Sequence, residues 1–334
     1  MIKKIGEKNP LTTEEKAYYK SQLGGAYIIG KQLGISGQGT STYLLTDKKG
    51  NRYALKIPND PQKIKSWLEQ QERAEELRNQ YIGEYRGAIH IPKTIQKGKD
   101  FIIEELAEGK EFLERVYDKL TPSQKRRVAK DFAEFLNYSH QRTLTGKTSK
   151  MHPDQQDRIS WQDTYNYFSL VLTEAEKKEL QKEIQIYTQQ KETLEILAFR
   201  DYRSQNLLWD DKKGCLSIID FDCTKKASVY EEFIPYAAAS SCLSYQFLRD
   251  VIKAYNECPK EHPLFIDLET VRNNYFVGIY HEYARCNIGK NPPEKYLRML
   301  RSDLKKLKKL MPTTLKKRLK NGSTPVKVEK EKTK

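Results

Sequence analysis

The chain has 334 residues, of which 37% are apolar, 31% charged and 10% aromatic, a composition typical of a globular protein large enough for two packed lobes. Its net charge of +15 lies mostly at one end, since residues 301–334 carry 13 Lys and Arg against three acidic residues, whereas the first 300 residues carry 47 against 42. This distribution argues against a nucleic-acid-binding surface along the whole chain, and no segment reaches the roughly 20 apolar residues of a membrane-spanning helix.

The first third of the sequence predicts short strands and one long helix. A helix start is indicated at Thr12 in TTEEK, because a threonine before acidic residues can cap the first N–H groups of a helix. Residues 26–58 contain three β-rich runs, YIIGKQL, STYLLT and RYALKI, and the turn sequence DKKGN separates the last two. Residues 61–80 predict a helix that begins with proline, and strands are expected near residues 90–96 and 101–105.

After Gly109 the pattern becomes mainly helical. Helices are expected in four segments: residues 121–140, 173–192, 229–257 and 265–311. Residues 199–222, FRDYRSQNLLWDDKKGCLSIIDFD, interrupt them with two short apolar runs on either side of the turn sequence DDKKG. The sequence from Asn321 onward is polar and Lys-rich, which predicts disorder. We therefore expect a β-rich first lobe and a helical second lobe that meet near residues 105–109.

Three glycines lie between the first two predicted strands. Gly34, Gly37 and Gly39 would let backbone N–H groups approach phosphate oxygens, although a glycine-containing turn without a ligand is the ordinary alternative. Lys56, in YALK of the next strand, could extend into solvent or could neutralise nucleotide phosphates. A phosphate-binding lysine needs a carboxylate to hold it, and the next helix offers four: Glu69, Glu72, Glu75 and Glu76.

A second group of polar residues belongs to the predicted hairpin of residues 199–222. The hairpin would bring Asn206 and Asp220 close together, and both carry the oxygen ligands that Mg²⁺ prefers. Asp201 would then be available to accept the proton of an acceptor hydroxyl, and Arg203 could contact the transferring phosphate. Turn formation would explain any one of these residues. It does not readily explain why all of them occur together, in this order, after a glycine-rich turn and a lysine on a strand.

In this combination the chain resembles the protein-kinase-like superfamily, which includes the aminoglycoside and choline kinases. The glycine-rich loop of that family is matched by Gly34, Gly37 and Gly39, with Ser36 where a glycine is usual. Lys56 matches the lysine that binds phosphates, and the resemblance implies Glu75 as its partner because the two lie 19 residues apart. The hinge that binds adenine through its backbone resembles the segment Glu104, Glu105 and Leu106.

The resemblance extends to the catalytic segment. Arg200, Asp201 and Asn206 match the loop pattern HRDxxxxN, with Phe199 in place of the histidine. Asp220, in IDFD, matches the metal-binding aspartate of the DFG-type motif. Because the lysine, the catalytic aspartate and the metal-binding residues are all present, the resemblance implies an active kinase rather than a pseudokinase scaffold.

Two departures separate the chain from ordinary protein kinases. Asp201 lies 61 residues after His140, which ends the preceding helix, and Asp222 replaces the glycine of the DFG-type motif without an APE motif behind it. The chain is therefore more similar to the aminoglycoside and choline kinase branch, or to an atypical protein kinase. Arg200 and Arg203, by contrast, look more like the protein-kinase loop than the HGDxxxxN form of small-molecule kinases.

The resemblance implies a bilobal α+β fold, β-rich in its N-lobe and mainly helical in its C-lobe. The expected domains are an N-terminal extension (residues 1–25), the N-lobe (26–107), the C-lobe (108–300) and a basic helix and tail (301–334). ATP with Mg²⁺ or Mn²⁺ is the implied cofactor. Because the helical lobe carries QKRR at residues 124–127 and no dense acidic run near the catalytic loop, a cationic acceptor is disfavoured. We expect an atypical Ser/Thr protein kinase able to phosphorylate itself, with a small-molecule hydroxyl kinase as the alternative.

The C-terminal lysines surround an apolar stripe of Leu304, Leu307, Leu310 and Met311. Such a stripe could bind an anionic lipid or an inositol polyphosphate and so regulate the kinase, or it could pack on the lobe as a last helix. Nucleic acid is not expected as a partner. Because the sequence has neither a transmembrane segment nor a secretory signal, a cytoplasmic location is expected, in a bacterium or, for a secreted bacterial effector, in its host.

Overall fold

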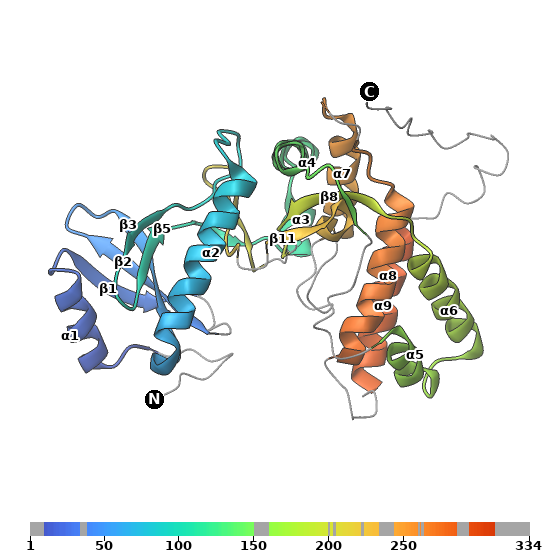
Figure 1. Cartoon of the computed structure of the whole chain (residues 1–334), viewed down its shortest axis with the longest axis horizontal. Coiled ribbons are helices and arrows are strands. Elements are labelled where there is room, and N and C mark those ends of the chain that lie inside the picture. The colour runs from blue at the N-terminus through green and yellow to red at the C-terminus, as the bar shows by residue number, and fades with distance from the viewer. Residues whose placement is uncertain are drawn as a thin grey trace, which may run out of the picture.

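The computed structural model describes residues 10–33, 39–149, 160–199, 201–202, 205–221, 224–233, 244–259, 261, 264–285 and 294–310. They form a mixed α+β structure in which a sheet from the N-terminal region stands beside a group of helices from the rest of the chain (Figure 1). This arrangement confirms the predicted fold class, with a β-rich first lobe and a mainly helical second lobe.

The first lobe is built on one antiparallel sheet. Its strands lie in the order β1 (Tyr27–Gln32), β2 (Thr40–Asp47), β3 (Arg52–Pro58), β5 (Ile102–Glu105) and β4 (Thr94–Lys97). Alternate residues of β2 are buried, which is the period expected for a strand with one face against a core. Tyr43, Leu45, Leu55 and Ile57 form that core. The strand expected at residues 90–96 is shorter, because His90 makes only an isolated bridge to Ser217.

The helix α1 (Thr13–Gln22) completes the core of the first lobe. It begins with a capping box, in which Thr12 accepts the N–H of Glu15 at 3.1 Å and Glu15 accepts the N–H of Thr12 at 2.9 Å. Tyr19, on the inner face of α1, is buried with Leu11 and Leu23 among the residues of the sheet. The described part of the segment expected to be an extension is thus packed as part of the first lobe.

The helix α2 (Ile64–Ile82) contacts both lobes. It follows a 3-10 turn (Pro61–Lys63) whose proline agrees with the predicted helix start. Near its beginning, the indole N–H of Trp67 donates to the hydroxyl of Thr40 at 2.8 Å. At its end, Tyr81 is fully buried in the core of the second lobe. Figure 1 shows α2 along the side of the sheet that faces the helical lobe.

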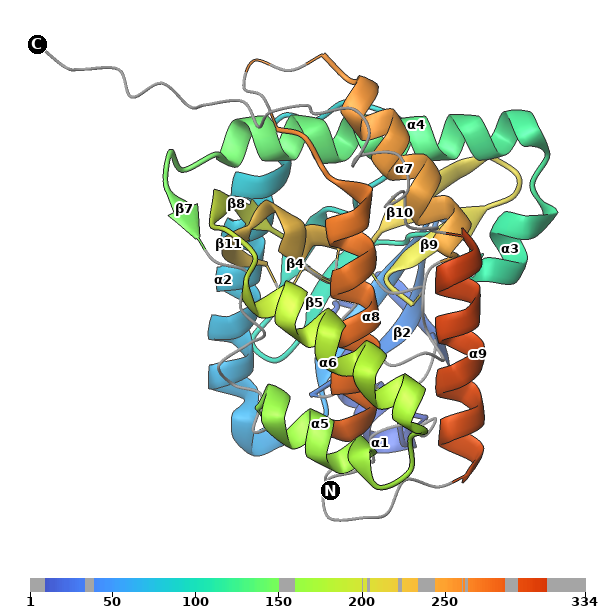
Figure 2. The same cartoon turned by 90° about the vertical axis from the view of Figure 1, so that its right-hand side faces the viewer.

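The second lobe packs its helices around one large apolar core. They are α3 (Glu114–Lys119), α4 (Pro122–Thr143), α5 (Trp161–Ser169), α6 (Glu174–Thr188), the 3-10 helix η2 (Val229–Phe233), α7 (Tyr245–Glu257), α8 (Leu268–Arg285) and α9 (Glu294–Leu310). α4 starts at the predicted cap, where Thr121 and Gln124 form a second capping box. α5 and α6 pack across α8, and α9 runs beside α8 (Figure 2).

Two small sheets hold the segments that lead to the polar hairpin. One has the order β10 (Cys215–Ile218), β9 (Leu207–Asp210) and β6 (Lys110–Glu111), and the other has the order β11 (Lys225–Ser228), β8 (Thr193–Ala198) and β7 (Thr148–Ser149). The sequence predicted β9 and β10 but not β6, β7, β8 and β11. Short strands such as TLEILA carry too few residues to show a period, and their partner strands are distant in sequence.

The helix α9 packs on the lobe through an apolar stripe. Leu297, Leu300, Leu304 and Leu307 are all buried, at most 6% exposed. The predicted stripe is therefore occupied by intramolecular packing at Leu304 and Leu307, whereas the side chains of Leu310 and Met311 lie outside the described residues. In the part of the chain that the structure describes, no helix is both long and apolar enough to cross a membrane.

Candidate active site

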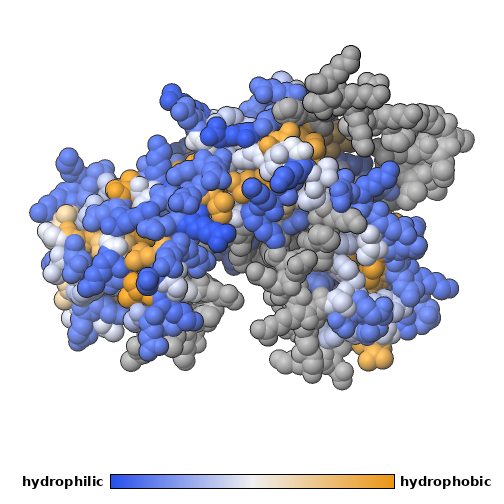
Figure 3. Space-filling model, in the orientation of Figure 1, coloured by the Kyte–Doolittle hydropathy of each residue, from blue (hydrophilic) through white to orange (hydrophobic). Residues whose placement is uncertain are grey.

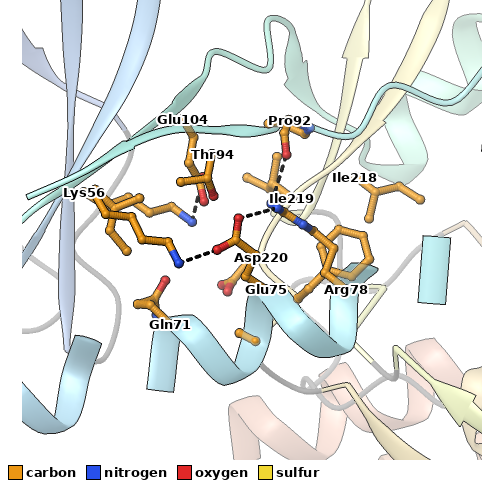
Figure 4. A pocket seen from close by; sticks show the side chains of 14 residues that line it. Lys56, Gln71, Glu75, Arg78, Pro92, Thr94, Glu104, Ile218, Ile219 and Asp220 are labelled. Carbon is orange, nitrogen blue, oxygen red and sulfur yellow. Dashed lines mark hydrogen bonds and ion pairs between the residues drawn. The ribbon is translucent and has the colours of Figure 1, made fainter. Parts of the chain in front are cut away.

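A pocket lies where the two lobes meet. It is an open hollow of about 470 Å³, a volume that includes open solvent, between the sheet, α2 and the end of β10. Figure 3 shows the hollow between the two lobes, and Figure 4 shows the side chains that enter the pocket. Its polar lining is Lys56, Gln71, Glu75, Arg78, Thr94, Lys97, Glu104 and Asp220. Residues predicted from separate motifs therefore line the same pocket.

Lys56 enters the pocket from the middle of β3. Its neighbours across the sheet are Thr42 of β2 and Ile102 of β5. The side chain is 19% exposed, and its ammonium group forms an ion pair with Glu104 at 2.9 Å (Figure 4). The side chain of Lys56 therefore does not extend into solvent in this structure. It agrees with the other interpretation, in which its ammonium group points into the pocket.

Glu75 faces the same pocket from α2 but makes its resolved ion pairs elsewhere. Its carboxylate binds Lys97 at 2.5 Å and Arg78 at 3.2 Å. Burial alone would raise the pKa of Glu75, but the hydrogen bonds from Lys97 and Thr94 hold it below its usual value. Lys56 thus forms its ion pair with Glu104 and not with the predicted Glu75, because Lys97 and Arg78 already compensate the charge of Glu75. The predicted Lys56–Glu75 pair is not formed in this structure.

The predicted hairpin is present and joins the two proposed metal ligands. β9 and β10 pair from Asp210–Cys215 down to Leu207–Ile218, and the ladder continues with a bond from the N–H of Ile219 to the carbonyl of Asn206 at 2.9 Å. Ile219 therefore lies opposite Asn206, and Asp220 is the next residue along the chain. The register of the hairpin explains how two residues 14 positions apart in sequence come to the same place.

Asn206 also orients Asp201. Its amide nitrogen donates to the Asp201 carboxylate at 2.8 Å and to the Asp201 carbonyl at 3.1 Å. Both residues are buried, at 2% and 5% exposure. These bonds use the nitrogen of the Asn206 amide, so its oxygen, the atom a metal would bind, takes no part in them. The arrangement fixes the carboxylate of Asp201 beside the base of the hairpin.

Asp220 has an unusual backbone conformation. Its φ angle is +65°, and it is the one non-glycine residue with positive φ in the described part of the chain. Its side chain is exposed towards the pocket, whereas the next residue, Phe221, is buried. A left-handed aspartate costs conformational energy, and such residues concentrate at functional sites. Both residues line the pocket, with the carboxylate exposed and the phenyl ring buried in its wall.

The remaining predicted site residues are only partly described. Gly34, Ser36, Gly37 and Arg203 lie outside the described residues. Gly39 has φ +87°, which a residue with a side chain rarely adopts, and its carbonyl accepts the N–H of Asn59 at 2.8 Å. The N–H of Glu105 donates to the carbonyl of Lys93 at 2.9 Å, so any adenine contact there would rely on other backbone groups, including those of Leu106.

Some residues of the site were missed by the sequence reasoning. Gln71 and Arg78 line the pocket from the same face of α2 as Glu75, at the helical spacing of four and three residues. That spacing could have identified them once Glu75 was chosen. Lys97 gave no such signal, because it occupies the end of a short strand whose pairing with β5 depends on the folded sheet.

Comparison with known proteins shows which family the chain belongs to. The sequence profile of the phosphotransferase enzyme family (APH) matches residues 31–265. A search of curated protein sequences found no match. Among solved structures, aminoglycoside 2'-phosphotransferase-IIIa in its GDP complex is similar at a TM-score of 0.58 and 15% identity, over 87% of this chain and 98% of that one.

Two further structures have the same fold. The streptomycin–ATP–APH(2'')-IIa complex is 17% identical over 91% of this chain and 99% of its own, with a TM-score of 0.53. Macrolide 2'-phosphotransferase MphH from Brachybacterium faecium is 13% identical over 84% of this chain and 99% of its own, with a TM-score of 0.55. The profile match covers most of the chain, and these neighbours share its two-lobed fold. The chain belongs to the phosphotransferase enzyme family.

Proposed function

We propose that the protein transfers the terminal phosphoryl group of a nucleoside triphosphate to a hydroxyl of a small organic molecule. The observation that carries the proposal is the convergence of Asp201, Asn206 and Asp220 at the base of one hairpin, next to a pocket that Lys56 enters from the other lobe. A turn or a structural ion pair would not need all four residues together.

The proposed chemistry follows from the roles that these side chains can take. Asp201 accepts the proton of the acceptor hydroxyl, whose oxygen forms a new bond to the terminal phosphorus. The bond between that phosphorus and the bridging oxygen breaks, and a nucleoside diphosphate leaves. Asn206 keeps the carboxylate of Asp201 in one orientation through the 2.8 Å bond. Lys56 binds the phosphates of the nucleotide with its ammonium group.

A divalent cation fits the donor set at the hairpin. Asn206 offers an amide oxygen and Asp220 a carboxylate, both suited to Mg²⁺ or Mn²⁺. Within the described residues there is no cluster of three or more His, Cys, Asp or Glu side chains for a metal. Two protein ligands are enough when nucleotide phosphates supply the others. When bound, the cation would neutralise charge on the phosphates; Asn206 and Asp220 would hold it.

The acceptor class rests on the family and on charge. The chain belongs to a phosphotransferase family, and its structural neighbours include aminoglycoside complexes and macrolide phosphotransferases. These similarities favour a small-molecule acceptor over a protein acceptor. The helical lobe carries the basic run QKRR at residues 124–127, which disfavours a strongly cationic acceptor such as an aminoglycoside. A neutral or anionic hydroxyl compound is therefore the proposed substrate. A Ser/Thr side chain, including one of the protein itself, is the second candidate because Arg200 and Arg203 match the protein-kinase loop.

The test is a transfer assay with the full chain, ATP or GTP, and Mg²⁺ or Mn²⁺. Mass spectrometry of a panel of macrolides, aminoglycosides, sugar phosphates, inositol phosphates and Ser/Thr peptides identifies the acceptor, and intact mass reports self-phosphorylation. Vesicles with anionic lipid, added to the same assay, test the proposed lipid regulation. Removing a general base lowers the rate of a reaction by about 10²- to 10⁴-fold. Asp201→Asn should therefore lower the transfer rate by at least about 100-fold.

Asp211→Asn is the matched control. Asp211 lies in the turn of the same hairpin, is well exposed and pairs with Lys110. The transfer rate of Asp211→Asn should therefore stay within about twofold of the wild-type rate. Equal rates for wild type and Asp201→Asn would contradict the proposal. Nucleotide binding by the wild type without transfer to any acceptor or to water would favour a pseudokinase scaffold instead.

A further inference from the structure

A buried group of polar side chains lies behind the candidate active site and takes no part in the chemistry proposed above. It joins Tyr81 at the end of α2, Tyr202 next to Asp201, and Glu232 in η2. Their exposures are 0%, 6% and 2%. Three parts of the chain that are distant in sequence therefore meet through hydrogen bonds in the core of the second lobe.

The direction of these hydrogen bonds follows from counting hydrogens. The hydroxyl of Tyr81 donates to a carboxylate oxygen of Glu232 at 2.8 Å and lies 2.7 Å from the hydroxyl of Tyr202. Since Tyr81 has one hydroxyl hydrogen, the hydrogen between the two tyrosines comes from Tyr202. Burial, reinforced by the charge of Glu232, raises the pKa of both phenols well above the usual value, so both keep their hydrogens.

The second oxygen of Glu232 holds the catalytic loop from the other side. It accepts the backbone N–H of Phe199 at 2.9 Å, two residues before Asp201. The imidazole of His140 lies 3.8 Å from the same oxygen, and its other nitrogen is 2.9 Å from the hydroxyl of Tyr255. Glu232 thus fixes the backbone two residues before Asp201, and through Tyr81 it also holds Tyr202, the residue immediately after Asp201.

We propose that the hydroxyls of Tyr81 and Tyr202 are positioning groups that hold Asp201 in its catalytic orientation and couple it to α2. The inference rests on the proposed function, because it assigns a role towards the same reaction. α2 carries Gln71 and Glu75 in the nucleotide pocket and Tyr81 in the network. A displacement of α2 in the pocket therefore moves the partner of the residue next to Asp201.

Packing alone does not account for the tyrosine hydroxyls. The ring centroids of Tyr202 and Phe199 lie 4.6 Å apart in an edge-to-face contact, and those of Tyr81 and Phe135 lie 5.7 Å apart. Phenylalanine would keep these ring contacts. The hydroxyls add directional bonds to a buried carboxylate, and such bonds restrict a loop more than apolar contacts do. Their effect should therefore appear in the rate of transfer more than in the fold.

The experiment is kinetics on Tyr81→Phe and Tyr202→Phe in the full chain. We expect each variant to lower kcat by roughly tenfold or more, with the nucleotide KM within about twofold of wild type, because a small misplacement of a catalytic group is costly. The double variant should lose no more than the worse single variant, since the two hydroxyls act as one unit. In the Asp201→Asn background, Tyr81→Phe should have no further effect.

Tyr85→Phe is the matched control. Tyr85 follows α2, packs its ring on the same Phe135 at 5.1 Å, and its hydroxyl is not bonded to Tyr202 or Glu232 in the described contacts. Its kcat should stay within about twofold of wild type. If Tyr81→Phe fails to fold, Tyr202→Phe still tests the proposal, because it leaves the bond between Tyr81 and Glu232 intact.

Amide hydrogen exchange separates this inference from the proposed function. Faster exchange at residues 199–206 in Tyr81→Phe, but not in Tyr85→Phe, is expected even for a chain that transfers no phosphate. Unchanged exchange together with unchanged kcat would overturn the positioning role. An inactive wild type with faster exchange in Tyr81→Phe would instead contradict the proposed function and leave the coupling between α2 and the loop supported.

Discussion

At the scale of single residues, two lysines reach one pocket and different glutamates hold them. Lys56 of β3 pairs with Glu104, whereas Lys97 of β4 pairs with Glu75, which also binds Arg78. Only Lys56 lies on β3, the strand that pairs with β2, and β2 is the strand that follows the predicted glycine loop in sequence. The two lysines therefore have similar surroundings but different expected roles, which makes one the natural control for the other.

Lys56→Met should weaken nucleotide binding by about 10- to 100-fold, because a bond to a charged group contributes about 1.5–3 kcal/mol. Calorimetric titration with the nucleotide measures this change. Lys97→Met removes the other lysine of the pocket and should change affinity less than threefold. A larger loss in Lys97→Met than in Lys56→Met would contradict the assignment and would point to Glu75 and Lys97 as the phosphate-binding pair.

The candidate site was predictable from the sequence where a residue's role depends on local spacing. Asn206 and Asp220 flank a hairpin whose turn sequence and apolar runs define its register. The partner of Lys56 was not predictable in this way. Glu104 lies on a neighbouring strand, and the choice between it and Glu75 depends on Lys97 and Arg78, which reach Glu75 only in the folded sheet and helix.

At the scale of elements, α9 is attached to the lobe by its apolar stripe and by ion pairs on its basic face. Arg301 binds Glu176 of α6 through two bonds, at 2.8 and 3.1 Å. Lys306 binds Glu114 of α3 at 2.8 Å, and Lys308 binds Glu179 of α6 at 2.6 Å. Part of the positive charge that suggested a lipid-binding helix is thus compensated within the protein.

The Glu176–Arg301 pair predicts a pH dependence of stability. The hydrogen bonds from Arg301 lower the pKa of Glu176 to about 2. Because this pKa is lower in the folded than in the unfolded chain, the stabilisation is complete above about pH 4.5 and is lost as the pH falls towards 2. Glu176→Gln should therefore lower the free energy of unfolding by about 1 kcal/mol at pH 7, since the pair is partly exposed.

Urea unfolding at pH 7 and at about pH 4 measures this effect. The difference between wild type and Glu176→Gln should be smaller at the lower pH. Glu179→Gln, which removes the other α6 partner of α9, serves for comparison at pH 7. A difference that stays constant or grows on acidification would show that the loss comes from packing rather than from the ion pair.

The capped starts of α1 and α4 were predicted, whereas α5, which begins with a capping box at Ser160, and the short buried strands were not. Thr12 and Thr121 start α1 and α4 because their hydroxyls satisfy N–H groups a few residues away, which is a local property. β8 and β11 pair across about 30 residues, and neither has the length or alternation that identifies a strand. Yet this pairing is what carries the chain to Phe199 and Asp201.

At the scale of the whole molecule, the site exists only when both lobes are together. Lys56 and Glu104 come from the sheet, Glu75 from α2, and Asp220 from the end of the hairpin in the second lobe. α2 contacts both lobes, through Trp67 at its start and Tyr81 at its end. The two lobes were predictable from the change of pattern near Gly109, and packing on the lobe was one of the two interpretations of the apolar stripe in α9. The packing of α1 was not predictable, because it depends on surfaces distant in sequence.

The central claim is that the two lobes form one site for a nucleotide and a divalent cation. Calorimetric titration of ATP or GTP, with Mg²⁺ and with a chelator, tests it most directly. We predict that Mg²⁺ tightens nucleotide binding to the wild type by about tenfold or more, and that Asp220→Asn abolishes this gain while Asp201→Asn retains it. An equal Mg²⁺ effect in Asp220→Asn, or no nucleotide binding by the wild type, would contradict the account.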